Sequence, residues 1–516
     1  MMAPDILTVQ TATSVMGNYT FKLTFEQYSV ILVWMAFFFT FLRLHEVKVT
    51  EKRVFHIAGF IVVALGCGLF TNQIILSDFM EEHQINIRMF RPMESYQKYG
   101  GVLTFARSVG YAVVKKPEGY TTAKVDQIIQ EYEKKSANEQ QSTAKQYPNI
   151  ITVVNETFAD IKVLGDFKTN EDYMPYFHSL KKNCVTGYTY ASIVGGQTAN
   201  TEFELLTGNT LGFLSAGTTA FQLYIHGQMP SLVSNLKAEG YSGNKAMHPF
   251  NPYNYNRPAV YKDFGFTDFI DKFDFPKNVK RVREYISDEA NVDRIISEYE
   301  KNRKKTDQPF YMYNMTIQNH SPYDKDAANF KQPIKIESSK YDAEANRYLN
   351  LIKYSDDSLK QLTSYFEKCK EPTIILFLGD HQPRLTDEFM NKITNGQYQT
   401  WSSEQMMKRY QVPFVIWANY DIKGQHIEKT SMNYIQSILT KTAGVKMTGY
   451  QRFLNEVRKE VPTITSQGYW GKNGKFYQIN DKGSPYYGII QKYRMIQYNM
   501  MFDKKNRRDS FFEVSK

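Results

Sequence analysis

Residues 195–203 read Gly195-Gly196-Gln197-Thr198-Ala199-Asn200-Thr201-Glu202-Phe203, a glycine turn that leads into a helix. Adjacent glycines permit a tight or left-handed backbone. Thr201 and Glu204 have the spacing of a capping box, and Gly208 predicts the end of the helix. Thr198 is then expected where free N–H groups and the helix dipole attract an anion such as phosphate. An ordinary capped surface helix gives the same local pattern, so the interpretation depends on the rest of the chain.

Apolar segments on both sides of this turn predict the fold class. The expected buried strands are residues 149–154, 309–316, 373–378 and 413–417. They alternate with helical patterns over residues 229–239, 341–369 and 431–440. This alternation is typical of an α/β domain with a largely parallel sheet. We place the main domain at residues 148–445.

The last part of the chain, residues 446–516, changes in character. Its short segments rich in Tyr, Gly and Lys predict a small β-rich or irregular subdomain. Residues 503–508 form a charged tail, and the simplest expectation is that solvent surrounds it.

Two apolar runs, at residues 28–42 and 55–76, precede the main domain. The second has the length of roughly 20 residues that a bilayer requires. The loop between them carries Arg43, Lys48, Lys52 and Arg53, and the positive-inside rule places such a loop in the cytoplasm. We therefore expect an extracytoplasmic segment over residues 1–27, two transmembrane helices over 28–76, and a multi-pass protein of the cell membrane. A buried helical hairpin in a soluble core is the alternative.

Residues 77–147 are expected to form a juxtamembrane helical connector. Apolar residues at helical spacing over 122–135 predict an amphipathic helix, and the polar run 136–146 predicts a linker. The main domain follows the second apolar run, so this topology places it outside the cytoplasm.

The composition restricts the partners. The 516 residues carry a net charge of +10, which favours anionic partners such as anionic lipid or a phosphate polymer. No Arg/Lys-rich block, zinc-ligand spacing or RNA-binding motif supports nucleic acid. The three cysteines, Cys67, Cys184 and Cys369, do not make a disulfide framework, although Cys184 and Cys369 could pair.

Polar side chains follow three predicted strands. Glu156 follows the first, His320 the second, and Asp380-His381 the third. In open parallel sheets, functional groups gather just past the carboxyl ends of strands. Singly, such residues are more often helix caps or structural groups. Together, Glu156, Asp380, His381 and Thr198 offer oxygen and imidazole ligands that suit Mn²⁺, Mg²⁺ or Zn²⁺. Such an ion would lower the pKa of the Thr198 hydroxyl and make it a nucleophile.

A second cluster lies in the loop at residues 247–257, which is rich in proline and asparagine. Arg257 offers bidentate contact to phosphate, and His248 can donate a proton or a hydrogen bond. Tyr255 could stack on a glycerol or a sugar. A surface loop with incidental polar groups is the alternative.

These motifs, in this order, resemble the lipoteichoic acid synthase family. That family consists of membrane-anchored phosphoglycerol transferases with an extracellular sulfatase/alkaline-phosphatase-like domain. The resemblance covers nearly the whole chain: residues 153–158 match the metal-glutamate strand, 198–203 the nucleophile turn and 378–381 the metal pair. The chain differs at Tyr255, where the best-known synthases carry Trp, and near Phe250, where they carry an acidic residue. It also shows fewer transmembrane helices than the family usually has.

The resemblance implies a mixed sheet flanked by helices and a role for each candidate residue. Glu156, Thr198, Asp380 and His381 would bind a manganese-type ion, and Thr198 would be the nucleophile. The glycerophosphate group would be held by His248, Tyr255, Arg257 and His320. Thr198 would attack phosphatidylglycerol, release diacylglycerol and become a glycerophospho-threonine. A hydroxyl of a glycerophosphate polymer or glycolipid would then accept the group.

Rival functions remain open. The nucleophile region lacks the C/S-x-P-x-R context of arylsulfatases, so a formylglycine sulfatase is not expected. A phosphoethanolamine transferase, a glycerophosphate transferase acting on a glycan, or a phosphodiesterase would use the same nucleophile and metal set. A membrane-anchored protein that only binds anionic polymer is the non-enzymatic alternative.

Overall fold

The structure is a computed structural model that describes residues 25–43, 53–76, 79–82, 85, 92–112, 114–136, 146–215 and 217–514. It divides into two compact units, Met1–Val113 and Val114–Lys516, which are considered separately. The predicted N-terminal segment 1–27 lies almost entirely outside the described residues, as do Lys48 and Lys52 of the basic loop. Both therefore remain predictions.

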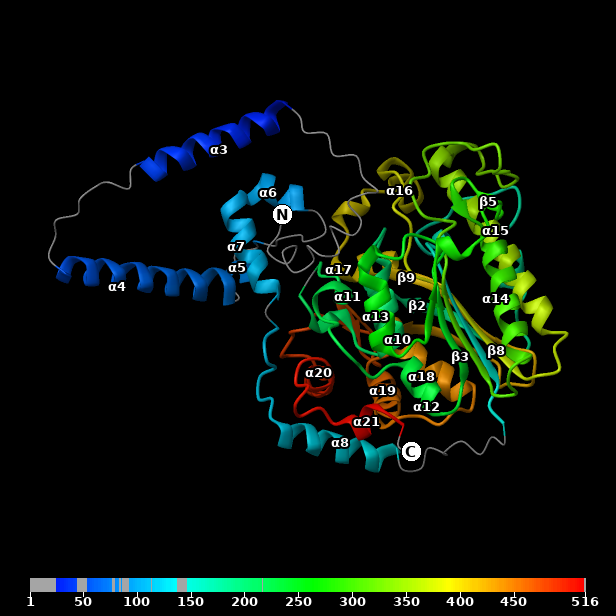
Figure 1. The fold of residues 1–516 in the computed structure, drawn as a ribbon. Coiled ribbons are helices and arrows are strands. Elements are labelled where there is room, and N and C mark those ends of the chain that lie inside the picture. Colours follow the sequence, from blue (N-terminus) through cyan, green and yellow to red (C-terminus); the bar gives the residue numbers. More distant parts are fainter. Residues whose placement is uncertain are drawn as a thin grey trace. The chain divides into compact units, whose positions relative to one another are not determined.

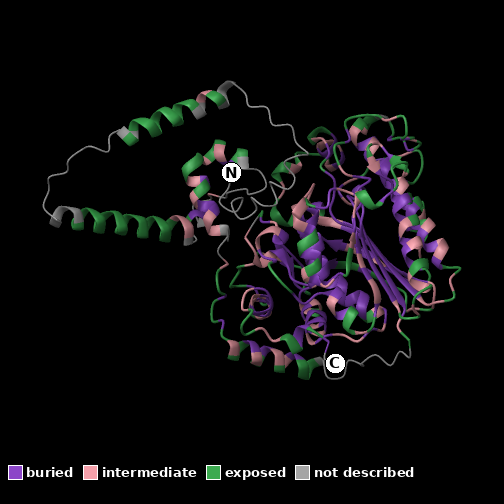
Figure 2. Ribbon diagram, in the orientation of Figure 1, coloured by how far each residue is buried: buried purple, intermediate pink, exposed green. Residues whose placement is uncertain are grey.

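The first unit contains helices whose residues are largely exposed (Figure 2), and many of these residues are apolar. Among the described residues, one stretch, Ile57–Ile75, is long and apolar enough to cross a membrane. It lies within the predicted second span. The predicted first span falls in a helix whose Trp34 and Phe37 are exposed, and the multi-pass topology stays a prediction. The helices are α3 (Phe25–Arg43), α4 (Arg53–Phe70), its π-helical continuation η3 (Thr71–Leu76), α5 (Phe79–Glu82), α6 (Pro92–Tyr99) and α7 (Gly101–Ala112).

An eight-stranded sheet forms the centre of the second unit (Figure 1). In order across the sheet, its strands are β10 (Gln425–Ser431), β2 (Cys184–Tyr190), β9 (Gln411–Ala418), β8 (Thr373–Gly379), β1 (Asn149–Asn155), β7 (Phe310–Met315), β3 (Ser242–Met247) and β4 (Asp268–Ile270). β1 pairs in parallel with β7 and β8. β9 runs antiparallel to β8 and β2. The sheet is therefore mixed and mostly parallel, as predicted.

Helices cover both faces of this sheet, because successive strand residues point to opposite sides. In β1, Ile150 and Val154 join one core, whereas Ile151 and Val153 join the other. The first core includes α8 (Thr122–Ser136), α10 (Thr198–Thr207), α12 (Leu232–Ala238), α13 (Arg257–Phe264), α18 (Met432–Thr442), α19 (Gly449–Glu460) and α20 (Tyr487–Met501). The second core includes α9 (Pro175–Ser179), α14 (Asp288–Arg303), α15 (Ala343–Phe366) and α16 (Asp387–Thr394), and Figure 1 shows α14 and α15 together on that side.

The predicted elements of the main domain are confirmed, with shifted ends. The strand expected at 149–154 is β1, and those at 309–316, 373–378 and 413–417 are β7, β8 and β9. The helix expected from residue 229 begins at Leu232, because Ser231 accepts a hydrogen bond from the Ser234 backbone and caps it. The patterns at 341–369 and 431–440 correspond to α15 and α18.

The region after residue 446 contains more helix than expected. A three-stranded sheet of β11 (Thr463–Thr465), β12 (Gly468–Trp470) and β13 (Phe476–Tyr477) is present. However, α19 and α20 are the longest elements of the region and contribute to the first core. The expectation of a β-rich or irregular subdomain is therefore wrong for these helices, whose aromatic side chains fill a shared core.

The charged tail is not simply solvated. The Arg508 guanidinium makes two bonds to the Asp126 carboxylate of α8, at 2.6 and 2.8 Å. The Tyr120 hydroxyl donates to Asp503 at 2.7 Å. Segment 503–508 thus folds against the start of the second unit. Cys184 and Cys369 are free thiols, so the considered pairing is absent from the described structure.

Candidate active site

The glycine turn aims Thr198 at the carboxyl edge of the sheet. Gly195, Gly196 and Gln197 all have positive φ, of 67°, 142° and 66°. A side chain at Gly195 would place its Cβ 3.0 Å from the Arg384 side chain, so glycine lets these two segments approach closely. Helix α10 begins at Thr198, which therefore occupies the N-terminal position predicted from the sequence.

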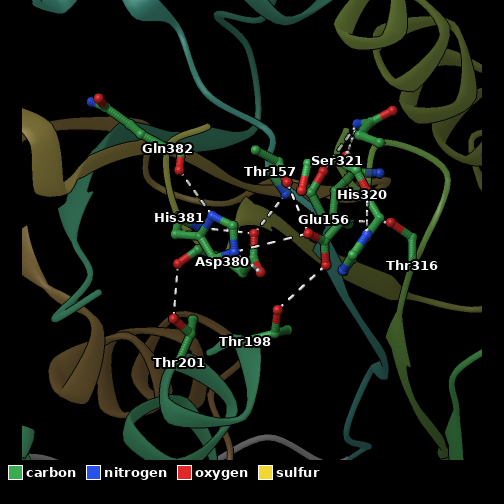
Figure 3. Close-up of polar contacts among 12 residues, drawn as sticks. Glu156, Thr157, Thr198, Thr201, Thr316, His320, Ser321, Asp380, His381 and Gln382 are labelled. Carbon is green, nitrogen blue, oxygen red and sulfur yellow. Dashed lines mark hydrogen bonds and ion pairs between the residues drawn. The ribbon is translucent and has the colours of Figure 1, made fainter. Parts of the chain in front are cut away.

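The capping-box prediction for this helix is wrong. Thr201 lies inside α10, and its hydroxyl donates to the Asp380 carbonyl at 2.8 Å (Figure 3). Glu204 instead accepts from the Leu211 backbone at 2.9 Å and from the Ser192 hydroxyl at 2.7 Å. The end of the helix is as predicted, since Gly208 is left-handed with φ 74°.

Three predicted metal ligands meet beside Thr198 (Figure 3). Glu156 follows β1, and Asp380 and His381 follow β8, which is the strand next to β1. One ligand atom from each of the three lies within 4.8 Å of the others, and all three residues are buried. The Thr198 hydroxyl donates to Glu156 Oε2 at 3.4 Å. The structure thus brings together the four residues expected to bind the ion.

The hydrogen bonds leave this cluster ready for a cation. Within the described residues, Asp380 Oδ2 and His381 Nε2 are buried without a hydrogen-bond partner. They lie 3.3 Å apart. His381 Nδ1 is 2.9 Å from the Gln382 carbonyl, which accepts its proton and leaves the Nε2 lone pair for a metal. Oxygen and imidazole donors in this arrangement fit Mn²⁺, Mg²⁺ or Zn²⁺.

Electrostatics support the same interpretation. Burial, together with the neighbouring Asp380, raises the pKa of Glu156 to about 8. Asp380 Oδ1 accepts from the backbone N–H groups of Thr157 and His381, at 2.6 and 2.8 Å. Two buried carboxylates at one place are costly unless a cation or proton neutralises them.

The loop cluster predicted to hold the substrate joins the same pocket. The Thr198 pocket has a volume of about 560 Å³, part of it open to solvent, and its lining includes the predicted metal ligands Glu156 and His381. All four residues expected to hold the glycerophosphate group also line it: His248, Tyr255, Arg257 and His320.

The pocket residues differ in their partners. The Nδ1 of His248 donates to the Met315 carbonyl at 3.0 Å. Burial, and to a lesser extent the positive charge of Arg257, holds the pKa of His248 well below its usual range. The imidazole is therefore neutral. Its Nε2 is consequently a hydrogen-bond acceptor, which suits a hydroxyl group better than a phosphate oxygen. His320 Nδ1 donates to the Ser321 carbonyl at 2.7 Å.

Arg257 is buried and already has an anionic partner. Its Nε and Nη2 donate to Glu202 Oε1 at 3.0 and 2.7 Å. The Tyr255 ring centroid lies 5.1 Å from the guanidinium carbon. No local pattern predicts this pairing, because Glu202 and Arg257 lie 55 residues apart.

Sequence reasoning also missed some pocket residues. Arg384, Tyr323 and Gln197 line the Thr198 pocket. Arg384 is exposed and lies three residues after His381. Only its position close to His381 could have predicted that it lines the pocket, because residues that follow one another in the chain lie at the same edge of the sheet.

Comparison with known proteins identifies the family. A model of the sulfatase family matches residues 148–445, and the chain belongs to this family. A Rhizobium meliloti protein assigned to cyclic beta-1,2-glucan modification is 30% identical over 433 residues, covering 82% of the chain and 65% of that protein. The lipoteichoic acid synthase of Staphylococcus saprophyticus is 23% identical over 374 residues, covering 69% of the chain and 55% of the synthase.

The fold is shared with a solved structure, the Streptococcus pyogenes phosphoglycerol transferase GacH in complex with sn-glycerol-1-phosphate. The TM-score is 0.63 at 20% identity, over 78% of the chain and 100% of GacH. The resemblance to lipoteichoic acid synthases and the sulfatase/alkaline-phosphatase-like fold are thereby confirmed. The chain spans less than two thirds of the length of the curated relatives it matches.

Proposed function

We propose that this protein transfers glycerophosphate from phosphatidylglycerol to an acceptor at the cell surface, as in lipoteichoic acid synthesis. One observation carries the proposal. The Thr198 hydroxyl at the start of α10 lies 3.4 Å from Glu156, beside buried Asp380 and His381, in a pocket that Arg257 also lines. A hydroxyl, an ion site and a buried cation in one pocket are what transfer of a substituted phosphate requires.

The reaction consists of two displacements at phosphorus. Thr198 Oγ1 loses its proton and forms a bond to the phosphorus of phosphatidylglycerol, the bond to the diacylglycerol oxygen breaks, and that oxygen takes up a proton. The product is glycerophospho-threonine. An acceptor hydroxyl then loses its proton and bonds to the same phosphorus, the bond to Thr198 Oγ1 breaks, and Thr198 takes up a proton to restore its hydroxyl. Each step exchanges one P–O bond for another.

Glu156, Asp380, His381 and Thr198 would hold the ion, which when bound lowers the pKa of a coordinated hydroxyl and neutralises phosphate charge. Arg257 would attract the phosphate oxygens. Neutral His248 would accept a hydrogen bond from a glycerol hydroxyl. The first backbone N–H groups of α10 add a favourable environment for the anion.

Related enzymes suggest different acceptors. The lipoteichoic acid synthase relative favours a glycerophosphate polymer or its glycolipid start. The relative assigned to cyclic beta-1,2-glucan modification matches more of this chain and favours a glycan as a second candidate. Phosphoethanolamine transfer remains a further alternative, because the same nucleophile and ion set would serve it.

The direct test uses the full chain in detergent with Mn²⁺ and headgroup-labelled phosphatidylglycerol. We expect diacylglycerol release and a glycerophosphate adduct that peptide mass spectrometry maps to Thr198. Thr198→Ala is the control and should show no adduct. An adduct formed only with phosphatidylethanolamine would show that this lipid, and not phosphatidylglycerol, is the donor. Absence of an adduct with any phospholipid would contradict the transferase proposal.

The acceptor is tested by a second incubation of the labelled protein. A glycerophosphate polymer primer and a cyclic glucan are supplied in parallel. Label on the primer supports polymer synthesis, and label on the glucan supports the second candidate. Release of the label only to water would favour a phosphodiesterase.

A further inference from the structure

Glu202 is a buried carboxylate on the helix that carries Thr198. It is fully inaccessible to solvent. Arg257 donates twice to Oε1, at 3.0 and 2.7 Å. The other oxygen, Glu202 Oε2, accepts hydrogen bonds from the Tyr313 hydroxyl at 3.1 Å and from the Tyr261 hydroxyl. Every oxygen of this carboxylate is therefore engaged.

Stability alone is a poor explanation for this pair. Removing two charges from water costs free energy that their attraction repays only in part, so buried ion pairs add little net stability. Apolar residues of similar size would fill the same space at lower cost. The geometry that the pair imposes is the better explanation.

The pair restricts the orientation of the guanidinium. Two of its three nitrogens, Nε and Nη2, are bound to Glu202. The third, Nη1, makes a long contact of 3.5 Å with the Asn254 carbonyl. The Tyr255 ring flanks the guanidinium, and Arg257 lines the Thr198 pocket. Because Glu202 binds the edge formed by Nε and Nη2, the pair determines which N–H groups of Arg257 remain to bind a substrate anion.

Glu202 also connects Arg257 to Thr198, because Glu202 and Thr198 lie on the same helix. It follows Thr198 by four residues in α10, so the two side chains lie on the same helix face about one turn apart. A rigid helical turn therefore connects the hydroxyl to the carboxylate that orients the arginine.

We propose that Glu202 is a positioning residue that fixes Arg257 relative to the Thr198 hydroxyl, so that the pocket binds a phosphate group in line for attack. The inference rests on the proposed function only for the choice of reaction. Its binding part concerns any phosphate group in the Thr198 pocket.

The chain offers a matched control for the test. Glu204 is also a buried carboxylate on α10. Its partners are Ser192, Thr210 and Leu211, which do not line the Thr198 pocket. Glu202→Gln and Glu204→Gln thus make the same substitution on the same helix, but only the first affects Arg257.

The experiment measures the affinity of the Mn²⁺-loaded full chain for inorganic phosphate by calorimetry, together with the melting temperature. We expect Glu202→Gln to weaken phosphate binding about tenfold or more, because a charge-assisted bond that orients Arg257 is lost. Glu204→Gln should leave the affinity within about twofold. In an Arg257→Ala background, Glu202→Gln should have no further effect on binding, since its target is gone.

Two results would overturn the inference. One is equal phosphate affinity in Glu202→Gln and Glu204→Gln. The other is an undiminished effect of Glu202→Gln in the Arg257→Ala background. If Glu202→Gln does not fold, Arg257→Lys replaces it, because lysine keeps the charge but cannot make both bonds; normal phosphate affinity in that variant would also overturn the inference. Absence of phospholipid cleavage by the unaltered protein would reject the proposed function but not this binding result.

Discussion

In the proposed function, the chemistry depends on Thr198. Thr198→Ala removes the hydroxyl oxygen that we propose forms the covalent intermediate, so we expect no adduct and a loss of turnover of about 10³-fold or more. Diacylglycerol release from phosphatidylglycerol measures turnover. Thr198→Ser keeps a hydroxyl at the same position and should retain measurable activity. Equal turnover in Thr198→Ala and the unaltered protein would reject the nucleophile assignment.

Glu156 makes the stability of the ion-free protein depend on pH. Its carboxyl has an ordinary pKa of 4.5, and burial raises it to about 8 in the folded chain. Between these values the folded protein binds more protons here than the unfolded chain, so its free energy of unfolding falls as pH rises. After EDTA treatment, we expect a lower melting temperature at pH 8 than at pH 6, with a change on the order of 2 kcal/mol from this group.

The control for this effect is Glu156→Gln. That variant carries no ionisable group at the position, so its ion-free stability should decrease less over the same pH range. Added Mn²⁺ should raise the melting temperature more at pH 8 than at pH 6, because the ion competes with the proton. An identical pH slope in both proteins would contradict the prediction.

At the scale of elements, close packing behind the site depends on Gly379 at the end of β8. A Cβ there would lie 1.8 Å from the Phe158 carbonyl oxygen, which cannot move without shifting the segment after β1. Gly379→Ala should therefore destabilise the protein by about 3 kcal/mol or more and weaken Mn²⁺ binding. Gly396→Ala is the matched control, because nothing lies within 4 Å of the added Cβ. Denaturant unfolding of both variants checks this.

Helix α8, which falls in the predicted juxtamembrane connector 77–147, belongs to the second unit. Its Val125, Ile128 and Tyr132 are buried in the first core, and Lys492 of α20 pairs with Glu131 at 2.6 Å. A fragment of residues 145–516 loses this helix, and we expect it to be less stable by several kcal/mol than a fragment of residues 114–516. Equal melting temperatures of the two fragments would contradict this packing role.

The sequence predicted best those elements whose own residues show a clear local pattern. β1, β7, β8 and β9 are apolar runs that lie deep in the sheet, and the carboxyl ends of β1 and β8 led directly to Glu156, Asp380 and His381. β2 and β10 carry Gly187 and the polar run before Ser431, so they lack a continuous apolar pattern. The Glu202–Arg257 pair and the packing of α19 and α20 depend on contacts between distant residues, which no local pattern reports.

At the scale of the whole molecule, the apolar stretch Ile57–Ile75 predicts attachment to the bilayer that contains the donor lipid. In vesicles of phosphatidylglycerol, we expect the full chain to cleave lipid faster than the 114–516 fragment, because attachment raises the local donor concentration. With detergent-solubilised lipid the two rates should converge. A fragment that is equally fast on vesicles would show that attachment does not serve catalysis.

The four-residue interval between Thr198 and Glu202 restricts which insertions and deletions can occur there during evolution. Each residue of an α-helix turns the chain by about 100°. An insertion or deletion between these positions would leave both residues in the sequence but carry the carboxylate away from Arg257. Descendants of this protein can therefore exchange residues within the interval more easily than they can change its length. In related chains, a gap at this place would mark loss of the coupled site even where both residue types survive.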